Sequence, residues 1–176
     1  AAAQQIQAQL PQVHFWIPLS LEIYRTAIEQ AVHQYQLRAT LVSGQSQTVI
    51  AAADLAIAKS GTANLEIALL DVPQVVMFRV NPVTAWIAKH ILKFSAPFVS
   101  PPNLVLMDSV VPELLQNEAT PDRIAQESLD ILLNPSRREA MLEQYRQMRQ
   151  KLGKPGVSDR AAQEILRCLK RPKASE

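Results

Sequence analysis

Residues 53–66 read ADLAIAKSGTANLE, an apolar run followed by a turn of small residues and a second apolar stretch. We interpret the run as a buried strand and the stretch after the turn as a helix that begins near Thr62. The first amides of a helix have no partner inside it and the dipole there is positive, so phosphate is a frequent ligand. Gly61 lets a ligand approach the backbone closely. The pattern therefore predicts an anion site at the amides of Gly61, Thr62 and Ala63.

Glu66 lies one turn into this helix, within reach of a sugar hydroxyl attached to a bound phosphate. The same residues also have a plainer interpretation, a tight crossover between strand and helix in which Ser60 is only the N-cap. The motif alone does not separate the two, because it needs its structural context.

Strand-like and helix-like segments alternate along the first half of the chain. The expected strands are 14–19, 39–43, 55–59 and 74–78, and the expected helices are 1–10, 21–35, 47–53 and 62–70. For the second helix we expect Ser20 as N-cap and an inner face of Ile23, Ala27 and Ile28. The alternation predicts an α/β fold with a parallel sheet and flanking helices. Ligands bind beyond the carboxyl ends of such strands, where the sequence places Ser43, Gly44, Ser60, Gly61 and Arg79.

The segment 94–110 is rich in proline, which favours extended backbone and argues against helix. Asn103 follows two of the prolines, so its amide would be held in a defined direction and could offer a ligand both a donor and an acceptor. A turn residue that bonds its own backbone is the alternative. Glu113 is expected to begin a short helix, either binding a hydroxyl or favouring the helix start.

Helical patterns fill the rest of the chain. Thr120 and Pro121 predict the start of a helix that runs to Leu133. Residues 136–139 read SRRE, a capping box for a helix with the apolar stripe Met141, Tyr145, Met148 and Leu152. A last helix, capped by Ser158, has the stripe Ile165, Leu166 and Leu169. No strand follows, so these stripes must pack on this domain, on another domain or on a partner.

The composition excludes several classes of function. The chain has 176 residues, a formal net charge of +2 and a single cysteine, Cys168. The charge gives no support for a nucleic-acid partner, and one cysteine permits no internal disulfide, which fits a reducing cytoplasm. The histidines lack a second ligand at metal spacing, and there is no Walker lysine, nucleophile elbow or full dinucleotide fingerprint. No apolar run approaches the roughly 20 residues that a membrane span needs.

Residues 83–93 have the pattern of an amphipathic helix with two lysines, Lys89 and Lys93, spaced as neighbours. A surface helix with its apolar face on the core is the commoner explanation. A helix lying on a membrane surface, with Trp86 and the lysines at the headgroups, is the alternative.

Five ordered stretches resemble lipid-A-disaccharide synthases: SGTANLE at 60–66, VPQVVMFR at 72–79, NP at 81–82, VSPPNL at 99–104 and VVPELLQ at 110–116. The resemblance covers residues 13 to 133 with few breaks, and beyond them only the helical character matches. The resemblance implies a GT-B glycosyltransferase, with two Rossmann-like domains and a cleft between them. Such an enzyme joins UDP-2,3-diacylglucosamine to 2,3-diacylglucosamine 1-phosphate, forming lipid A disaccharide and UDP.

This resemblance implies that the chain is the C-terminal, UDP-sugar-binding half. Residues 1–133 would form the Rossmann-like domain, without the strand and glycine-bearing loop that precede its first helix in the family. Residues 134–176 would be C-terminal helices that pack back on this domain, on the absent N-terminal domain or on a partner. Lack of that N-terminal domain predicts exposed apolar surface or a swapped homodimer.

The resemblance also implies roles for the site residues. The amides of the turn would hold the UDP diphosphate, Glu66 the ribose hydroxyls, and Arg79 would neutralise phosphate unless it pairs with a core carboxylate. The substrate-binding set is then Ser43, Gly44, Ser60, Gly61, Thr62, Ala63, Glu66, Arg79 and Asn103. Asn103, placed at the cleft, is the one catalytic candidate in this half, and the general base is expected in the other domain. No cofactor and no metal are required.

The expected partners are the UDP-sugar lipid donor and the phosphorylated lipid acceptor, with peripheral membrane contact through 83–93. The expected location is cytoplasmic, on the cytoplasmic face of the inner membrane, and this fragment alone should be inactive. A non-catalytic or epimerase-like UDP-sugar-binding α/β module is the alternative, because a fold does not fix a function.

Overall fold

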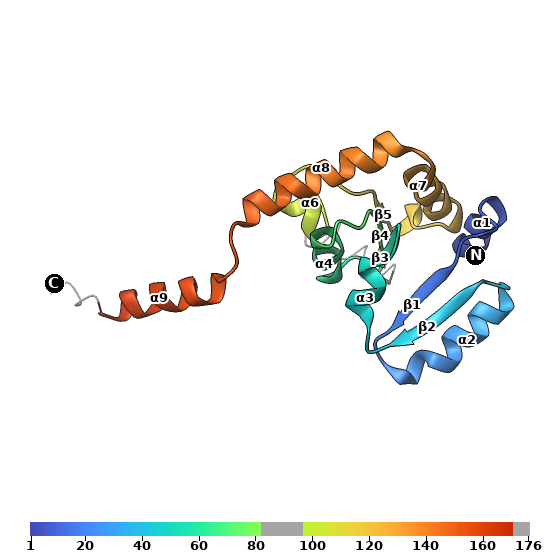
Figure 1. Ribbon diagram of the computed structural model, residues 1–176, viewed down its shortest axis with the longest axis horizontal. Coiled ribbons are helices and arrows are strands. Elements are labelled where there is room, and N and C mark those ends of the chain that lie inside the picture. The colour runs from blue at the N-terminus through green and yellow to red at the C-terminus, as the bar shows by residue number, and fades with distance from the viewer. Residues whose placement is uncertain (82–96, 171–176) are drawn as a thin grey trace.

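The computed structural model describes residues 1–81 and 97–170, so the expected membrane-contact segment 83–93 lies outside the described residues. Its strands are β1 (Phe15–Leu19), β2 (Ala39–Ser43), β3 (Ala56–Lys59), β4 (Gln74–Phe78) and β5 (Glu113–Leu115). Its helices are α1 (Ala2–Gln9), η1 (Glu22–Tyr24), α2 (Arg25–Gln34), α3 (Ser46–Ala51), α4 (Ala63–Leu69), α6 (Pro101–Leu106), η2 (Gln116–Glu118), α7 (Pro121–Leu133), α8 (Pro135–Leu152) and α9 (Val157–Lys170). Figure 1 shows their arrangement.

The described strands form two parallel sheets, β1–β2 and β3–β4–β5. Within the described residues β1 pairs only with β2, and β3 pairs only with β4, so no ladder joins the two sheets. Strands and helices alternate around these sheets (Figure 1). The predicted fold class, α/β with a parallel sheet and flanking helices, is confirmed.

The main core lies around β4, the middle strand of the larger sheet. Val75 and Val76 are completely buried, as expected for a central parallel strand that is covered on both faces. Helix α8 packs on α4, α6 and α7 and contributes buried residues of the predicted stripe, among them Tyr145 and Met148. Leu152, the last member of that stripe, is 42% exposed because it lies at the end of the helix.

A second apolar cluster spans the space between the two sheets. Ile6 of α1 is buried against Ala125 and Leu129 of α7. Phe15 of β1 and Ile57 of β3 both pack against this cluster. Since no ladder joins the sheets, these side-chain contacts are what links β1 to the larger sheet.

The expected helix 21–35 is present but differs at its start and its inner face. It begins with the 3-10 turn η1, and α2 follows with Tyr24 as its N-cap, so Ser20 is not the cap. Ile23 is 81% exposed, Ala27 is exposed and Ile28 is half-buried. The predicted inner face is therefore wrong at Ile23 and Ala27, and only Ile28 of the three is partly covered.

The proline-rich segment contains a helix that the sequence prediction excluded. Pro101 and Pro102 occupy the first turn of α6, where a missing N–H costs nothing because that group has no partner in a helix anyway. Met107 adopts a left-handed conformation, with φ of 55°, and ends α6. Glu113 opens β5 and not the short helix that was expected.

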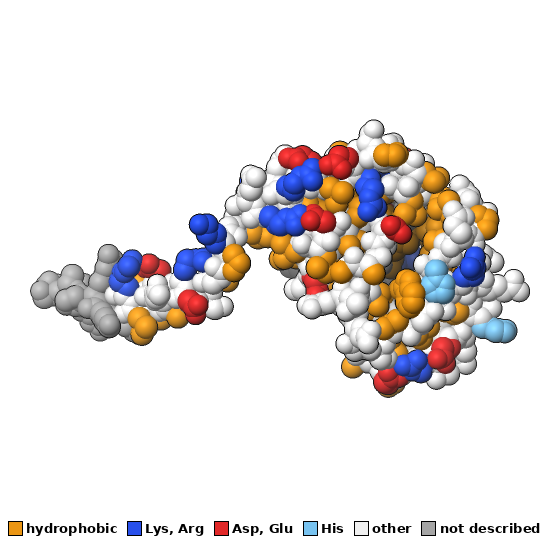
Figure 2. All heavy atoms as spheres, in the orientation of Figure 1, with side chains coloured by type: hydrophobic (Ala, Val, Ile, Leu, Met, Phe, Trp, Pro, Cys, Tyr) orange, Lys and Arg blue, Asp and Glu red, His pale blue; other side chains and the backbone are white. Residues whose placement is uncertain are grey.

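The C-terminal helices follow the prediction in extent but not in capping. Asn134 caps α8 by accepting from the backbone N–H of Arg137, so the predicted capping box at Ser136 is not the cap. Helix α9 begins at Val157, which places Ser158 inside it. Figure 2 shows apolar and charged side chains together on α9, which extends away from the body. Ile165 is 61% and Leu166 55% exposed, so apolar side chains are exposed on α9, while their link to an absent N-terminal domain stays a prediction.

Candidate functional site

The carboxyl edge of the larger sheet brings together residues from three strands. Three residues directly follow the strands of this sheet: Ser60 follows β3, Arg79 follows β4 and Gln116 follows β5. The register places these strand ends side by side, with Lys59 opposite Met77 and Phe78 opposite Leu115. The backbone N–H of Val80 also donates to Gln116 Oε1 at 3.4 Å. This edge is where an open parallel sheet binds its ligand.

Ser60 is held on both sides. Its backbone N–H donates to the Met77 carbonyl at 2.9 Å, which continues the ladder between β3 and β4. Its hydroxyl donates to the Val99 carbonyl at 2.7 Å. The hydroxyl therefore anchors the segment that leads into α6, and it is not the N-cap of α4, whose cap position is Thr62.

Glu113 completes this anchoring, and sequence reasoning missed that role. One carboxylate oxygen accepts from the Val99 N–H at 2.9 Å, and the other accepts from the N–H and the hydroxyl of Ser100 at 2.8 and 2.5 Å. We call Ser60, Val99, Ser100 and Glu113 the Glu113 clamp. Both stretches stand out in the sequence, VSPPNL at 99–104 and VVPELLQ at 110–116. Neither stretch contains a pattern that indicates contact between them.

The turn itself offers two unoccupied amides. The N–H of Gly61 donates to Asn64 Oδ1 at 2.7 Å, so it is already used inside the turn. Thr62 and Ala63 are exposed, and their N–H groups have no acceptor among the described residues. Glu66 is half-buried, and its carboxylate bonds no other described residue. The structure thus leaves the Thr62 and Ala63 amides and the Glu66 carboxylate available.

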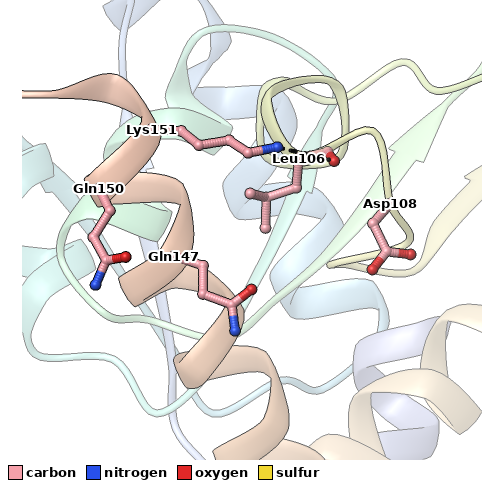
Figure 3. Close-up of a pocket in the computed structure, with 5 residues that line it drawn as sticks. All are labelled: Leu106, Asp108, Gln147, Gln150 and Lys151. Carbon is pink, nitrogen blue, oxygen red and sulfur yellow. Dashed lines mark hydrogen bonds between the residues drawn. The ribbon is translucent and has the colours of Figure 1, made fainter.

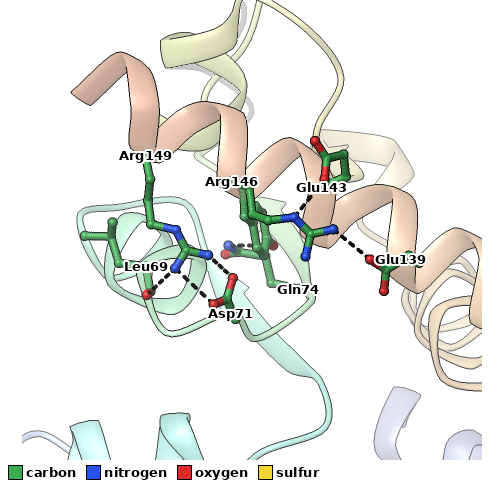
Figure 4. A network of polar contacts seen from close by, with 8 residues as sticks. Leu69, Asp71, Gln74, Glu139, Glu143, Arg146 and Arg149 are labelled. Atoms are coloured by element: carbon green, nitrogen blue, oxygen red, sulfur yellow. Dashed lines mark hydrogen bonds and ion pairs between the residues drawn. The ribbon is translucent and has the colours of Figure 1, made fainter. Parts of the chain in front are cut away.

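Asn64 is tied to the core by a buried polar network. Its Nδ2 donates to Gln74 Oε1 at 3.0 Å, and Gln74 Nε2 donates to the Asn64 carbonyl at 2.9 Å and to Tyr145 Oη at 3.3 Å. Burial raises the pKa of Tyr145 well above its usual range, so the hydroxyl stays protonated. Figure 4 shows Gln74 together with the ion pair of Arg149 and Asp71, in which Arg149 belongs to α8.

Asn103 is buried, with 1% of its surface exposed. Its Oδ1 accepts from the N–H groups of Val110 and Val111 at 2.9 and 2.8 Å, and its Nδ2 donates to the Val111 carbonyl at 3.0 Å. These bonds match the backbone-bonding alternative. They fix the turn between α6 and β5 and leave the side chain no open face toward a ligand.

Arg79 is exposed and forms no ion pair with any described residue. A guanidinium free of a carboxylate at this edge can meet an anion. The alternative prediction, pairing with a core carboxylate, finds no partner in residues 1–81 and 97–170.

Ser43 and Gly44 lie at the end of β2, in the other sheet. The Ser43 hydroxyl donates to Glu22 Oε1 at 2.7 Å and accepts from Arg25 Nη2 at 2.9 Å. Hydrogen bonds from Arg25 and Ser43 lower the pKa of Glu22 from 4.5 to about 2. Gly44 has φ of 72°, and an added Cβ would meet open space. No hydrogen bond among the described residues joins this pair to the Ser60 turn.

Two surface hollows are lined by residues outside the Ser60 turn, and the second of them includes Glu113 of the clamp. One, of about 440 Å³, is lined by Leu106, Asp108, Gln147, Gln150 and Lys151 (Figure 3). The other, of about 330 Å³, runs along the start of β5 beside Arg123 and Arg137, whose charges are met by Glu127. Neither is lined by residues 60–66. We keep the carboxyl edge as the candidate, because the turn after β3 and Arg79 after β4 have amides and a guanidinium without a partner among residues 1–81 and 97–170.

The described residues hold no group of His, Cys, Asp and Glu side chains arranged to bind a metal ion. None of the described helices is both long enough and apolar enough to cross a membrane.

The model of the lipid-A-disaccharide synthetase family matches residues 1–166. The chain belongs to this family. The match extends through α8 and most of α9, further than the expected limit near residue 133. The C-terminal helices are therefore part of the family's structure and not an unrelated extension.

Curated relatives named lipid-A-disaccharide synthase support the same assignment. The protein of Gloeothece citriformis is 61% identical over 165 residues, and that of Synechocystis sp. is 52% identical over 166 residues. A relative from Myxococcus xanthus is 39% identical over 168 residues. These matches cover 94–96% of this chain but 42–43% of each relative, so the chain spans about two fifths of their length.

Proposed function

We propose that this chain is the donor-nucleotide half of a glycosyltransferase that makes lipid A disaccharide. The enzyme joins UDP-2,3-diacylglucosamine to 2,3-diacylglucosamine 1-phosphate and releases UDP. The observation that carries the proposal is the carboxyl edge of β3–β4–β5 in a chain of this family, where the turn that begins at Ser60 and the residue Arg79 follow the ends of adjacent strands.

Each group at the edge has a role in holding the UDP. The Thr62 and Ala63 amides bind the diphosphate, and Arg79 offsets the charge that the leaving UDP gains during transfer. Glu66 binds the ribose hydroxyls.

Ser60 holds the segment beside the turn, while Asn103 acts through the backbone that it fixes. Gly61 supports the turn, and Ser43 and Gly44, at the end of β2 in the other sheet, are given no direct role.

The rest of the enzyme lies in other parts of the protein. The general base belongs to an N-terminal domain, so this chain alone binds UDP and catalyses no transfer. A strand placed between β1 and β3 would pair with both of their free edges and join the two sheets.

The enzyme works on the cytoplasmic face of the inner membrane, with residues 83–93 as its membrane contact. The exposed stripe of α9 supports exchange of this helix between two copies of the protein.

Calorimetric titration of UDP into this chain tests the proposal. We expect saturable binding that Glu66→Ala abolishes, because the ribose loses its acceptor while the fold keeps its core. Glu139→Ala is the matched control, since Glu139 is an exposed glutamate on α8. Equal UDP affinity in Glu66→Ala and Glu139→Ala would remove Glu66 from the site. Absence of UDP binding to the folded wild-type chain would contradict the donor site.

The second candidate is a non-catalytic or epimerase-like UDP-sugar-binding module. The observation that favours it is the engagement of the Gly61 amide by Asn64, which leaves the turn two amides and not three. A transfer assay on the protein that also carries the N-terminal domain separates the two. Disaccharide formation supports the synthase, and UDP binding without transfer supports the module.

A further inference from the structure

A buried polar relay runs from helix α8 to the ligand turn. It consists of Tyr145, Gln74 and Asn64, each 0% exposed, and it ends on the backbone N–H of Gly61. Tyr145 is 71 residues from Gln74 in the sequence, so the relay couples a C-terminal helix to the strand–turn–helix unit. Buried polar groups of this kind are retained only when they are satisfied, because an unpaired one is costly.

Two backbone groups, the Gly61 N–H and the Asn64 carbonyl, fix the direction of each bond in the relay. The Gly61 N–H can only donate, so the atom of Asn64 that faces it must be the oxygen. Asn64 Nδ2 then faces Gln74 and requires its oxygen. The Asn64 carbonyl can only accept, so it requires Gln74 Nε2, whose second hydrogen points to Tyr145 Oη. Neither amide can flip without losing two bonds.

The relay has a consequence for the turn. It holds the Gly61 N–H on Asn64, while Thr62 and Ala63, the next two residues, are exposed and their N–H groups have no acceptor in the part of the chain that the structure describes. The ligand face of the turn is therefore defined by which amide the relay engages.

We propose that Asn64, Gln74 and Tyr145 are positioning residues, which withhold the Gly61 amide and present those of Thr62 and Ala63 to an anionic group of the ligand. The proposal rests on the proposed function, because the ligand is taken to be UDP. None of the three side chains touches the ligand. Their effect is on the geometry of the turn, and it reaches the site from α8.

Amide spectra of the ¹⁵N-labelled chain during a UDP titration test the first part. We expect saturable shifts at Thr62 and Ala63, with the Gly61 amide keeping its slow hydrogen exchange. Asn64→Ala calibrates this readout, because it removes the Gly61 acceptor and must speed exchange at that amide. Loss of Gly61 protection in the wild-type chain when UDP binds would overturn the proposal.

Tyr145→Phe tests the second part with the least disturbance, since it removes one hydroxyl and keeps the ring. Loss of one neutral hydrogen bond is expected to weaken UDP binding about threefold to tenfold, and exchange at Gly61 should become faster. Met148→Leu is the control, a buried volume-conserving change three residues along the same helix. It should alter neither the UDP affinity nor exchange at Gly61.

The outcomes separate this proposal from the function on which it rests. If Tyr145→Phe behaves like Met148→Leu in both measurements, the positioning role is wrong even though UDP binds. If the wild-type chain does not bind UDP but Tyr145→Phe still speeds exchange at Gly61, the hold on Gly61 is supported and the donor-site function is overturned.

Discussion

The unit β3–β4–β5 and the unit β1–β2 have the same parallel design but very different interiors. In the larger sheet β4 contributes Val75 and Val76, both 0% exposed, and α8 contributes Tyr145 and Met148 to the same cluster. In the smaller unit Leu19 is the one buried residue of β1, and α2 has none. A parallel sheet is normally covered on both faces. The comparison shows that the larger sheet carries its own core, while the smaller one depends on neighbours for burial.

The largest expected effect is in the core of the larger unit. Met148→Ala should lower the free energy of unfolding by about 2–5 kcal/mol, because the Met148 side chain is fully buried and its truncation leaves a cavity in the core. Urea unfolding followed by circular dichroism measures this. A loss of unfolding free energy below about 1 kcal/mol would mean that the surrounding side chains close the cavity. The cores of the two units would then differ less in stability than their burial implies.

Next in size is the Glu113 clamp, which ties the start of β5 to the segment before α6 in the same unit. Glu113→Gln places an amide nitrogen opposite an N–H group of Val99 or Ser100, and it should cost about 1.5–3 kcal/mol of unfolding free energy. Ser100→Ala removes only the hydroxyl contact and should cost about 0.5–1.5 kcal/mol. Equal losses in the two variants would show that the backbone bonds to the carboxylate contribute nothing.

The smaller unit has its own charged contact, which should respond to pH. Because bonds from Arg25 and Ser43 lower the pKa of Glu22 from 4.5 to about 2, its stabilisation is present above pH 4.5 and is lost as the pH falls toward 2. An NMR titration of the Glu22 side chain should show a midpoint near 2. Ser43→Ala should move the midpoint upward. A midpoint near 4.5 in the wild-type chain would contradict the contact.

The smallest effect is expected on the exposed face of the smaller unit. Ile23 is 81% exposed, so Ile23→Ala should change the unfolding free energy by less than about 0.5 kcal/mol. The measurement is the same urea titration as for Met148→Ala. A large loss at Ile23 would show that this face is covered in solution, which would weaken the contrast between the two units.

The sequence predicted those elements whose signals are local. β2 and β4 have the expected bounds, and α7 begins at the Thr120 cap and Pro121 as the motif requires. The stripe through Tyr145 and Met148 is buried because its period matches the helix. Helix α6 was missed because two prolines were read as helix breakers, although the first turn of a helix accepts them.

The candidate site was predicted in its location but not in its contacts. Strand ends alone placed Ser60, Gly61 and Arg79 at one edge, since parallel strands share a direction. The same reasoning put Ser43 and Gly44 there, which is wrong because β2 belongs to the other sheet. The engagement of the Gly61 amide depends on Asn64, whose partner Gln74 lies on another strand. Pairing between Glu113 and Ser100 likewise depends on two segments meeting in space. No periodicity in one sequence contains such information.

The free edges of β1 and β3 have a consequence for behaviour in solution. Within the described residues each of these strands has a pairing partner on one side only, so a row of backbone N–H and C=O groups is left open. Such a row is a template for any extended peptide and a route to aggregation. Solutions of this chain should therefore self-associate through strand pairing as concentration rises, and a short peptide that fits the gap should suppress it.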